Sequence, residues 1–217
     1  MSEKRTIDVV LPDSGPLISL AASGHLDLLL HFKPYVRIIV ADLVAFEATR
    51  YPERFEDARQ VESFFGANTE RIEIMETVVG QVHINGAKLW DAYQRASPED
   101  RAAMDRAGVT PKKPPRDQGE VAILAVARQI GRECPDDIML VLAEDQSFLS
   151  RGKFAEPHTH VLSTRAFIQG LADLKVIEFE RVWADIIAAR PQINQEFVNR
   201  CAPDVETEWE SVIDEGR

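Results

Sequence analysis

The feature that most limits the fold of this chain is its alternation of short apolar runs with longer helical patterns. Strand-like runs, mostly apolar and several rich in β-branched side chains, occupy residues 6–12, 36–41, 138–143 and 160–162. Residues 71–75 alternate polar with apolar side chains, as a strand at a sheet edge does. Helical patterns lie between these runs, at residues 15–22, 26–30, 53–65, 86–96 and 119–131 and after Asp42, which can cap its helix. The sequence therefore predicts an α/β fold with a central parallel sheet flanked by helices on both faces.

Two segments depart from this alternation. Residues 97–118 contain four prolines among many charges and show no periodicity, which predicts a long loop. From Thr164 onward the pattern is helical, and the tail carries an apolar stripe formed by Phe179, Val182, Trp183, Ile186, Ile187, Ile193, Phe197 and Val198. We therefore expect a main domain at residues 1–177 and a helical extension at residues 178–217. The stripe must be buried on its own domain, in a homodimer or against another partner.

Charge and cysteine content limit the ligands and the cellular compartment that are expected for this protein. The 217 residues include 36 acidic and 25 basic side chains, a net charge of -11, which repels phosphate at long range unless bound cations reverse the local sign. Cys134 and Cys201 match no zinc or disulfide spacing and are expected to be free thiols in a reducing compartment. The sequence shows neither a secretory signal nor a run of about 18 apolar residues, so a cytoplasmic protein without a membrane segment is expected.

Four acids stand at related places in the predicted fold. Asp13 follows the first strand and Asp145 follows the strand at 138–143, whereas Glu47 and Glu120 lie near the starts of helices. Functional sites of open parallel sheets form at the carboxyl ends of the strands, near the point where strand order reverses. Clustered carboxylates repel one another, so such a group implies a cation, and hard oxygen ligands suit Mg²⁺ or Mn²⁺.

Each acid taken singly has a purely structural explanation. Asp13 at the end of a strand can cap the next helix, and Glu120 in a first helical turn favours the helix dipole. Glu47 can be a solvated helix residue and Asp145 a turn residue. The combination, with the residues around each acid, is what indicates a site.

Those surrounding residues resemble the motifs of the PIN-domain ribonucleases, in the family's order. Residues 13–18 (Asp-Ser-Gly-Pro-Leu-Ile) resemble the opening motif, and residues 44–47 (Val-Ala-Phe-Glu) resemble the second. Residues 119–123 (Gly-Glu-Val-Ala-Ile) resemble the third motif of a toxin-like branch, and residues 144–148 (Glu-Asp-Gln-Ser-Phe) resemble the fourth. The resemblance covers about residues 6–177. It departs from the family in Ala143, where a hydroxyl residue is frequent, and in the longer segment at 71–118.

The resemblance implies a PIN-like fold and metal-dependent hydrolysis of RNA phosphodiesters. In that mechanism Asp13, Glu47, Glu120 and Asp145 hold one or two Mg²⁺ or Mn²⁺ ions. Ser14 orients a ligand carboxylate or caps the following helix, and Glu144 is peripheral. Basic residues near the site are candidates for RNA contact, namely Lys112, Lys113, Arg116, Arg151 and Lys153. A small antitoxin protein and a second copy of the chain are further candidate partners.

Three function classes remain open at the level of sequence. The leading one is an endoribonuclease, as the toxin of a toxin–antitoxin pair. The second is a PIN-fold module that binds nucleic acid or protein with little or no catalysis. The third is an unrelated α/β phosphohydrolase, which the absence of a glycine-rich phosphate loop and of an Asp-x-Asp after the first strand disfavours.

Overall fold

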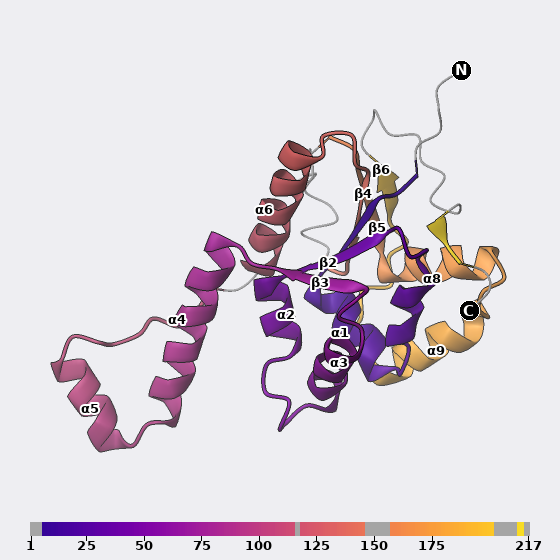
Figure 1. Cartoon of the computed structure of the whole chain (residues 1–217). Coiled ribbons are helices and arrows are strands. Elements are labelled where there is room, and N and C mark those ends of the chain that lie inside the picture. The colour runs from indigo at the N-terminus through magenta and orange to yellow at the C-terminus, as the bar shows by residue number, and fades with distance from the viewer. Residues whose placement is uncertain (1–5, 116–117, 146–156, 202–211, 215–217) are drawn as a thin grey trace.

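The central element of the protein is a six-stranded sheet with helices packed around it (Figure 1). The computed structural model describes residues 6–115, 118–145, 157–201 and 212–214. The strand order is β3-β2-β1-β4-β5-β6, and all neighbours are parallel except the antiparallel pair β5 and β6. The strands are β1 (Val9–Pro12), β2 (Arg37–Ala41), β3 (Ile72–Met75), β4 (Met139–Ala143), β5 (Thr159–Ser163) and β6 (Asn199–Cys201). The α/β prediction and the edge position of residues 71–75 are confirmed.

The helices follow the strands in the predicted order. They are α1 (Ser14–Ala22), the short 3-10 helix η1 (Leu26–His31), α2 (Asp42–Ala48), α3 (Glu56–Ala67), α4 (Val78–Arg95), α5 (Pro98–Arg106), α6 (Gln118–Glu133), α8 (Thr164–Asp173) and α9 (Phe179–Ala189). Helix α4 begins eight residues before the predicted start at residue 86, and Figure 1 shows α4 and α5 extending away from the sheet. In the described part of the chain, no helix has the length and apolarity needed to cross a bilayer.

Strand order reverses at β1, which pairs with β2 on one side and β4 on the other. Pro12 lies opposite Leu142 in this register, and the backbone N–H of Asp13 donates to the Leu142 carbonyl at 2.8 Å. All residues of β1 and β4 are buried, as expected for central parallel strands. The ends of β1 and β4 are therefore fixed side by side at the reversal point, where open sheets leave a crevice.

The prediction of a structureless loop at residues 97–118 is wrong in its first half. Residues 98–106 form α5, whose N-cap is Ser97; its hydroxyl accepts a hydrogen bond from the Asp100 N–H at 3.1 Å. Pro98 stands in the first turn, where a missing N–H costs nothing. None of the α5 residues is buried, so this helix contributes little to the core.

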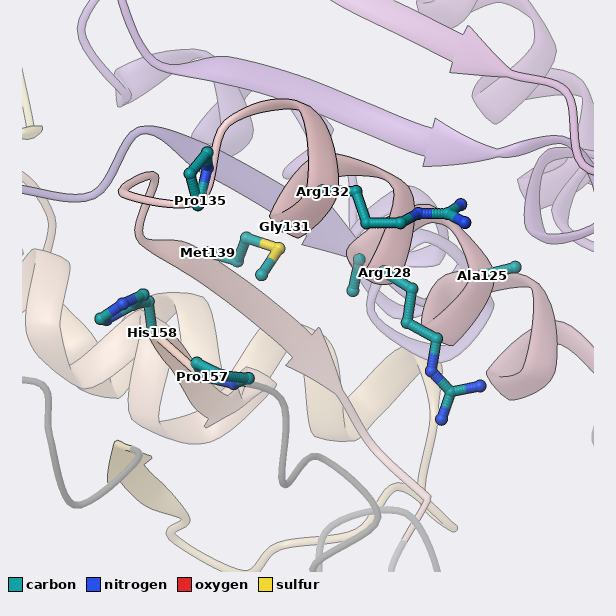
Figure 2. A pocket seen from close by; sticks show the side chains of 9 residues that line it. Ala125, Arg128, Gly131, Arg132, Pro135, Met139, Pro157 and His158 are labelled. Carbon is teal, nitrogen blue, oxygen red and sulfur yellow. The ribbon is translucent and has the colours of Figure 1, made fainter.

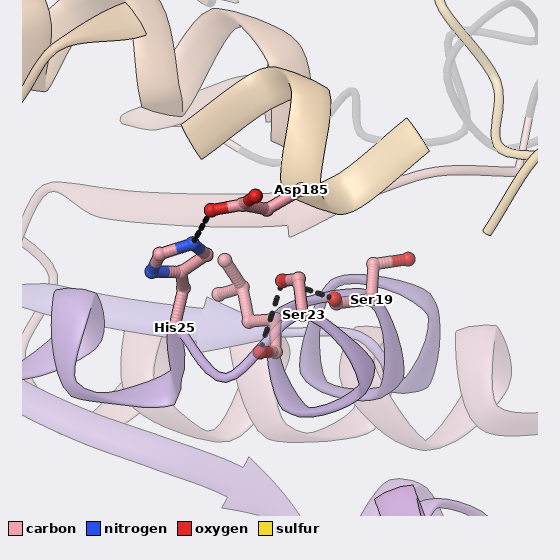
Figure 3. A network of polar contacts seen from close by, with 5 residues as sticks. Ser19, Ser23, His25 and Asp185 are labelled. Carbon is pink, nitrogen blue, oxygen red and sulfur yellow. Dashed lines mark hydrogen bonds and ion pairs between the residues drawn. The ribbon is translucent and has the colours of Figure 1, made fainter. Parts of the chain in front are cut away.

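The prediction of a helical extension at residues 178–217 is wrong for residues 190–201, which form no helix. Phe197 and Val198 lie outside any helix, and β6 follows them and pairs with β5. Residues of the tail are part of the main core, including Val182, Ile186, Ile193, Val212 and Ile213. Figure 3 shows a polar contact that ties α9 to the turn after α1, a 3.0 Å approach of His25 Nε2 to Asp185 Oδ2. The stripe is thus largely covered by its own domain, while the independence of residues 1–177 stays a prediction.

Helix α2 is held against α4 by a buried carboxylate. Asp42 is the first residue of α2 rather than its N-cap, and its carboxylate accepts hydrogen bonds from Thr77 Oγ1 and Gln81 Nε2, both at 3.0 Å. A side chain at Gly80 would place its Cβ in collision with Asp42 Oδ1, so glycine is required there. This contact fixes the orientation of the helix that carries Glu47.

Candidate functional site

A pocket of about 290 Å³ lies at the carboxyl ends of β1 and β4. Five segments far apart in the sequence meet there: the β1–α1 junction, α2, the start of α6, the residues after β4 and the residue after α9. The lining residues are Asp13, Ser14, Gly15, Glu47, Gly119, Glu120, Glu144, Asp145 and Arg190. The structure therefore brings together all four predicted acids, with Ser14 and Glu144 beside them.

The acids of this carboxylate pocket differ in exposure. Asp13, Glu120 and Glu144 are 8%, 5% and 9% exposed, whereas Glu47 is half-buried and Asp145 is exposed. Three nearly buried carboxyl groups in one place are costly unless a proton or another cation compensates their charge. Burial of this kind is uncommon for acids that serve only as solvated surface residues.

The cost of burying a carboxylate is clearest at Asp13, because its pKa is strongly raised. Burial raises its pKa from 3.8 to about 7; the Ser14 backbone N–H opposes this rise, and the charges of Glu47, Glu120 and Glu144 add to it. Asp13 occupies the N-cap position of α1, but its side chain makes no capping hydrogen bond to that helix. The capping explanation is therefore not supported, and the raised pKa marks Asp13 as a candidate functional group.

Two glycines of the quoted motifs make room for the acids. An added Cβ at Gly119 would lie 2.8 Å from Glu47 Oε2, and one at Gly15 would lie 3.0 Å from Glu144 Cβ. Both distances are shorter than ordinary contacts between side-chain atoms. The absence of side chains at these positions thus lets Glu47 and Glu144 approach the starts of α6 and α1.

Glu144 is more central than the sequence indicated. Its Oε1 accepts a 2.7 Å hydrogen bond from Thr164 Oγ1, and its backbone carbonyl accepts one from Asn194 Nδ2 at 3.1 Å. Burial raises the pKa of Glu144, against the lowering effects of its hydrogen bonds and of the Arg190 charge. The side chain of Glu144 is buried in the pocket wall, and its expected role beside the ligands rather than among them stays a prediction.

Arg190 is the lining residue that sequence analysis missed. It follows α9 directly and brings a cation from the tail into the carboxylate pocket. In the described part of the chain, its Nε and Nη1 atoms are buried without a hydrogen-bond partner. Buried donors of this kind normally find an acceptor, so they mark a place where an anionic group can bind. No local signal identifies Arg190, because only tertiary packing brings the end of α9 to β4.

The donor set of the pocket suits a hard divalent cation. Carboxylate oxygens are the preferred ligands of Mg²⁺ and Mn²⁺, and burial together with the neighbouring charges of Glu47, Glu120 and Glu144 raises the pKa of Asp13. Among the described residues, however, no three acidic, histidine or cysteine side chains are already grouped as ligands of one ion. The residues of the pocket therefore carry the donor atoms that a divalent metal prefers. Their side chains would have to move closer together to bind one ion.

The predicted RNA-contact residues divide into two groups. Lys112 and Lys113 are exposed between α5 and α6, and Lys113 lines a second pocket next to the carboxylate pocket. Arg116, Arg151 and Lys153 lie outside the described residues.

A larger pocket of about 750 Å³ lies elsewhere, between α6 and the starts of β4 and β5 (Figure 2). Arg128, Arg132, Met139 and His158 line it, and none of the four acids does. Its wall is mostly apolar and, among the described residues, contains no acid, so it does not supply the carboxylates that the predicted chemistry needs.

In comparisons with known proteins, the chain matches no protein-family model, and no curated protein matches it significantly. The case for a function therefore depends on the pocket itself.

Proposed function

We propose that this chain is a metal-dependent endoribonuclease of the PIN type. The observation that carries the proposal is the meeting of Asp13, Glu47, Glu120 and Asp145 in one pocket, with the pKa of Asp13 raised to about 7. The acids of the four motifs that resemble the PIN family converge at the strand-order reversal between β1 and β4. This convergence supports the family assignment more strongly than any single motif.

In the proposed mechanism the four acids hold Mg²⁺ or Mn²⁺, directly or through water. When bound, the ion supplies hydroxide near neutral pH and neutralises charge on the reacting phosphate. Asp13 would have to give up its proton to serve as a ligand, and Ser14 would orient a ligand carboxylate. Arg190 donates from its unpartnered nitrogens to a phosphate oxygen of the substrate.

Glu144 has a different role in this scheme. Its hydrogen bond from Thr164 and the nearby charge of Arg190 hold it in the pocket wall. From there it keeps Arg190 close to the reacting phosphate and adds negative charge that favours cation binding.

The direct test is cleavage of a single-stranded RNA by the purified protein with Mn²⁺ or with EDTA. We expect cleavage only with Mn²⁺. Asp13→Asn should lower the rate at least about 100-fold, because even groups that merely support metal ligands are worth 10–100-fold. Asp27→Asn, on the exposed side of η1, is the matched control and should cleave normally. Equal rates for wild type and Asp13→Asn would refute the proposal.

The same experiment distinguishes the nuclease from the other two function classes. Binding of RNA without cleavage in Mn²⁺ would indicate a binding module, and hydrolysis of p-nitrophenyl phosphate without RNA cleavage would indicate a phosphohydrolase. The toxin role and the antitoxin partner remain predictions from the resemblance. Growth arrest on expression, relieved by a small protein encoded beside the chain, would test both.

A further inference from the structure

A basic groove adjoins the carboxylate pocket and shares Glu47 with it. This second pocket measures about 580 Å³ and lies among the end of α2, the residues after it, α4 and the segment before α6. Its lining includes Arg50, Arg54, Trp90, Arg95 and Lys113. The lining also holds two acids, Glu47 and Asp91, so its four cations leave a local excess of positive charge in a protein of net charge -11.

One wall of the basic groove is rigid. Arg50 Nε donates to Asp91 Oδ2 at 3.1 Å, and the Tyr51 hydroxyl donates to Asp91 Oδ1 at 2.6 Å. The Arg50 guanidinium also lies 4.9 Å from the centre of the Tyr51 ring. Tyr51 has a φ of 64°, a left-handed conformation that a bulky residue adopts only when surrounding contacts enforce it. These contacts fix the end of α2 against α4.

The other three cations of the basic groove indicate that it binds an anion from outside the protein. Arg50 is committed to the nearly buried Asp91, whereas Arg54, Arg95 and Lys113 are exposed. The 3.7 Å pair of Arg54 with Glu53 joins two exposed side chains and holds Arg54 only weakly. Positive side chains that converge on one groove beside the pocket can follow a chain of phosphates.

Trp90 adds selectivity for unpaired bases. It is half-buried on α4, where it stacks on Tyr93 with ring centres 6.3 Å apart, and it also lines the basic groove. Stacking on an aromatic side chain requires a base whose face is free, as in single strands and loops. A duplex hides its base faces and cannot use this surface.

We propose that the basic groove binds single-stranded RNA next to the phosphate held in the carboxylate pocket. Arg54, Arg95 and Lys113 contact backbone phosphates, and Trp90 stacks on a base. The position of the cut relative to this segment rests on the proposed nuclease function, but binding in the groove does not require cleavage.

The test measures RNA binding in the Asp13→Asn background with Mn²⁺, by fluorescence anisotropy of a short labelled oligouridine over a range of salt concentrations. Reversing Arg54 and Arg95 to Glu should weaken binding at least about tenfold and lower the salt slope by about two. Trp90→Ala should weaken binding about tenfold, and Trp90→Phe should restore most of it because the ring face is kept. The matched control reverses Arg128 and Arg132 to Glu, two exposed arginines on α6 away from the groove (Figure 2), and should leave binding unchanged.

Three results would overturn the inference. They are no binding of single-stranded RNA by Asp13→Asn, equal weakening by the Arg128/Arg132 control, or equally tight binding of a duplex of the same length. Groove-dependent binding by a protein whose wild type cuts no RNA would uphold the groove and refute the nuclease. If the groove variants leave both RNA cleavage and RNA affinity unchanged, the nuclease would be upheld and the groove refuted.

Discussion

The hydroxyl of Thr164 donates a 2.7 Å hydrogen bond to Oε1 of Glu144, and both side chains are buried. Thr164 begins α8 and Glu144 follows β4, so this bond joins two elements at the wall of the carboxylate pocket. It supplies a hydrogen bond to a buried acid, so its loss should lower the stability of the fold as well as change the pocket wall.

We expect Thr164→Val to lower the free energy of unfolding by about 1–3 kcal/mol near neutral pH, because it leaves a buried carboxylate short of a donor. Urea unfolding measures the loss. Thr49→Val is the matched control, since the Thr49 hydroxyl donates to the Ala45 carbonyl within its own helix and stabilises no buried charge. A loss no greater than in the control would mean that Glu144 does not depend on Thr164.

The raised pKa of Asp13 predicts how stability depends on pH in EDTA. The folded state has a pKa of about 7 for Asp13 and the unfolded state about 3.8, so between these values the folded state binds more protons. This stabilisation is fully present below the unfolded pKa and is lost as pH rises through 7. The free energy of unfolding should therefore fall from about pH 5 to about pH 8 more steeply in wild type than in Asp13→Asn. Parallel pH profiles of the two proteins, measured by urea unfolding, would contradict the assignment.

Divalent metal should reverse that loss. A cation that binds only the folded state, at ~100-fold excess over its Kd, adds roughly 2.7 kcal/mol to the free energy of unfolding. The gain should be larger at about pH 8 than at about pH 6, because protons compete for Asp13. Thermal melting with millimolar Mn²⁺ measures it, and an unchanged melting temperature would count heavily against a metal site.

Gly119→Ala should separate metal binding from folding. The new methyl would lie 2.8 Å from Glu47 Oε2, the end of a flexible side chain, so the carboxylate moves while the backbone stays. We expect about 10–100-fold weaker Mn²⁺ binding, with melting in EDTA nearly unchanged. Gly131→Ala lies on the same helix with open space around it and should leave both properties intact. Equal metal affinity in the two variants would remove Glu47 from the ligand set.

The predicted homodimer needs a different surface from the one first expected. Val182 and Ile186 of the tail stripe are buried in their own domain, whereas Val78, Val82 and Leu89 are exposed along one face of α4. Sedimentation at micromolar concentration should give twice the chain mass of 24.4 kDa, and Val82→Glu should reduce it to one. A single-chain mass for the wild type would contradict the dimer, and a dimer unaffected by Val82→Glu would exclude this face.

The parts that sequence predicted best are those with local chemical signals. Buried parallel strands read as apolar runs, and an acid directly after such a run falls at the strand's carboxyl end, which is why Asp13 and Asp145 could be placed together. Helix α5 lacks an apolar periodicity, so its charges and the prolines around it favour a loop, although Ser97 and Asp100 mark a helix start. Strand β6 and Arg190 gave no such signal, because each depends on contacts with residues distant in the sequence.

Strand β6 has a consequence for the solubility of the protein. Its three residues are the only pairing in the described chain that covers the outer edge of β5. That edge carries buried Val161 and Leu162, and an uncovered strand of this composition is a template for pairing with other molecules. A truncation before Asn199 would therefore leave the edge of β5 unpaired and able to pair with other molecules. The shortened protein would be found in aggregates rather than as an inactive monomer.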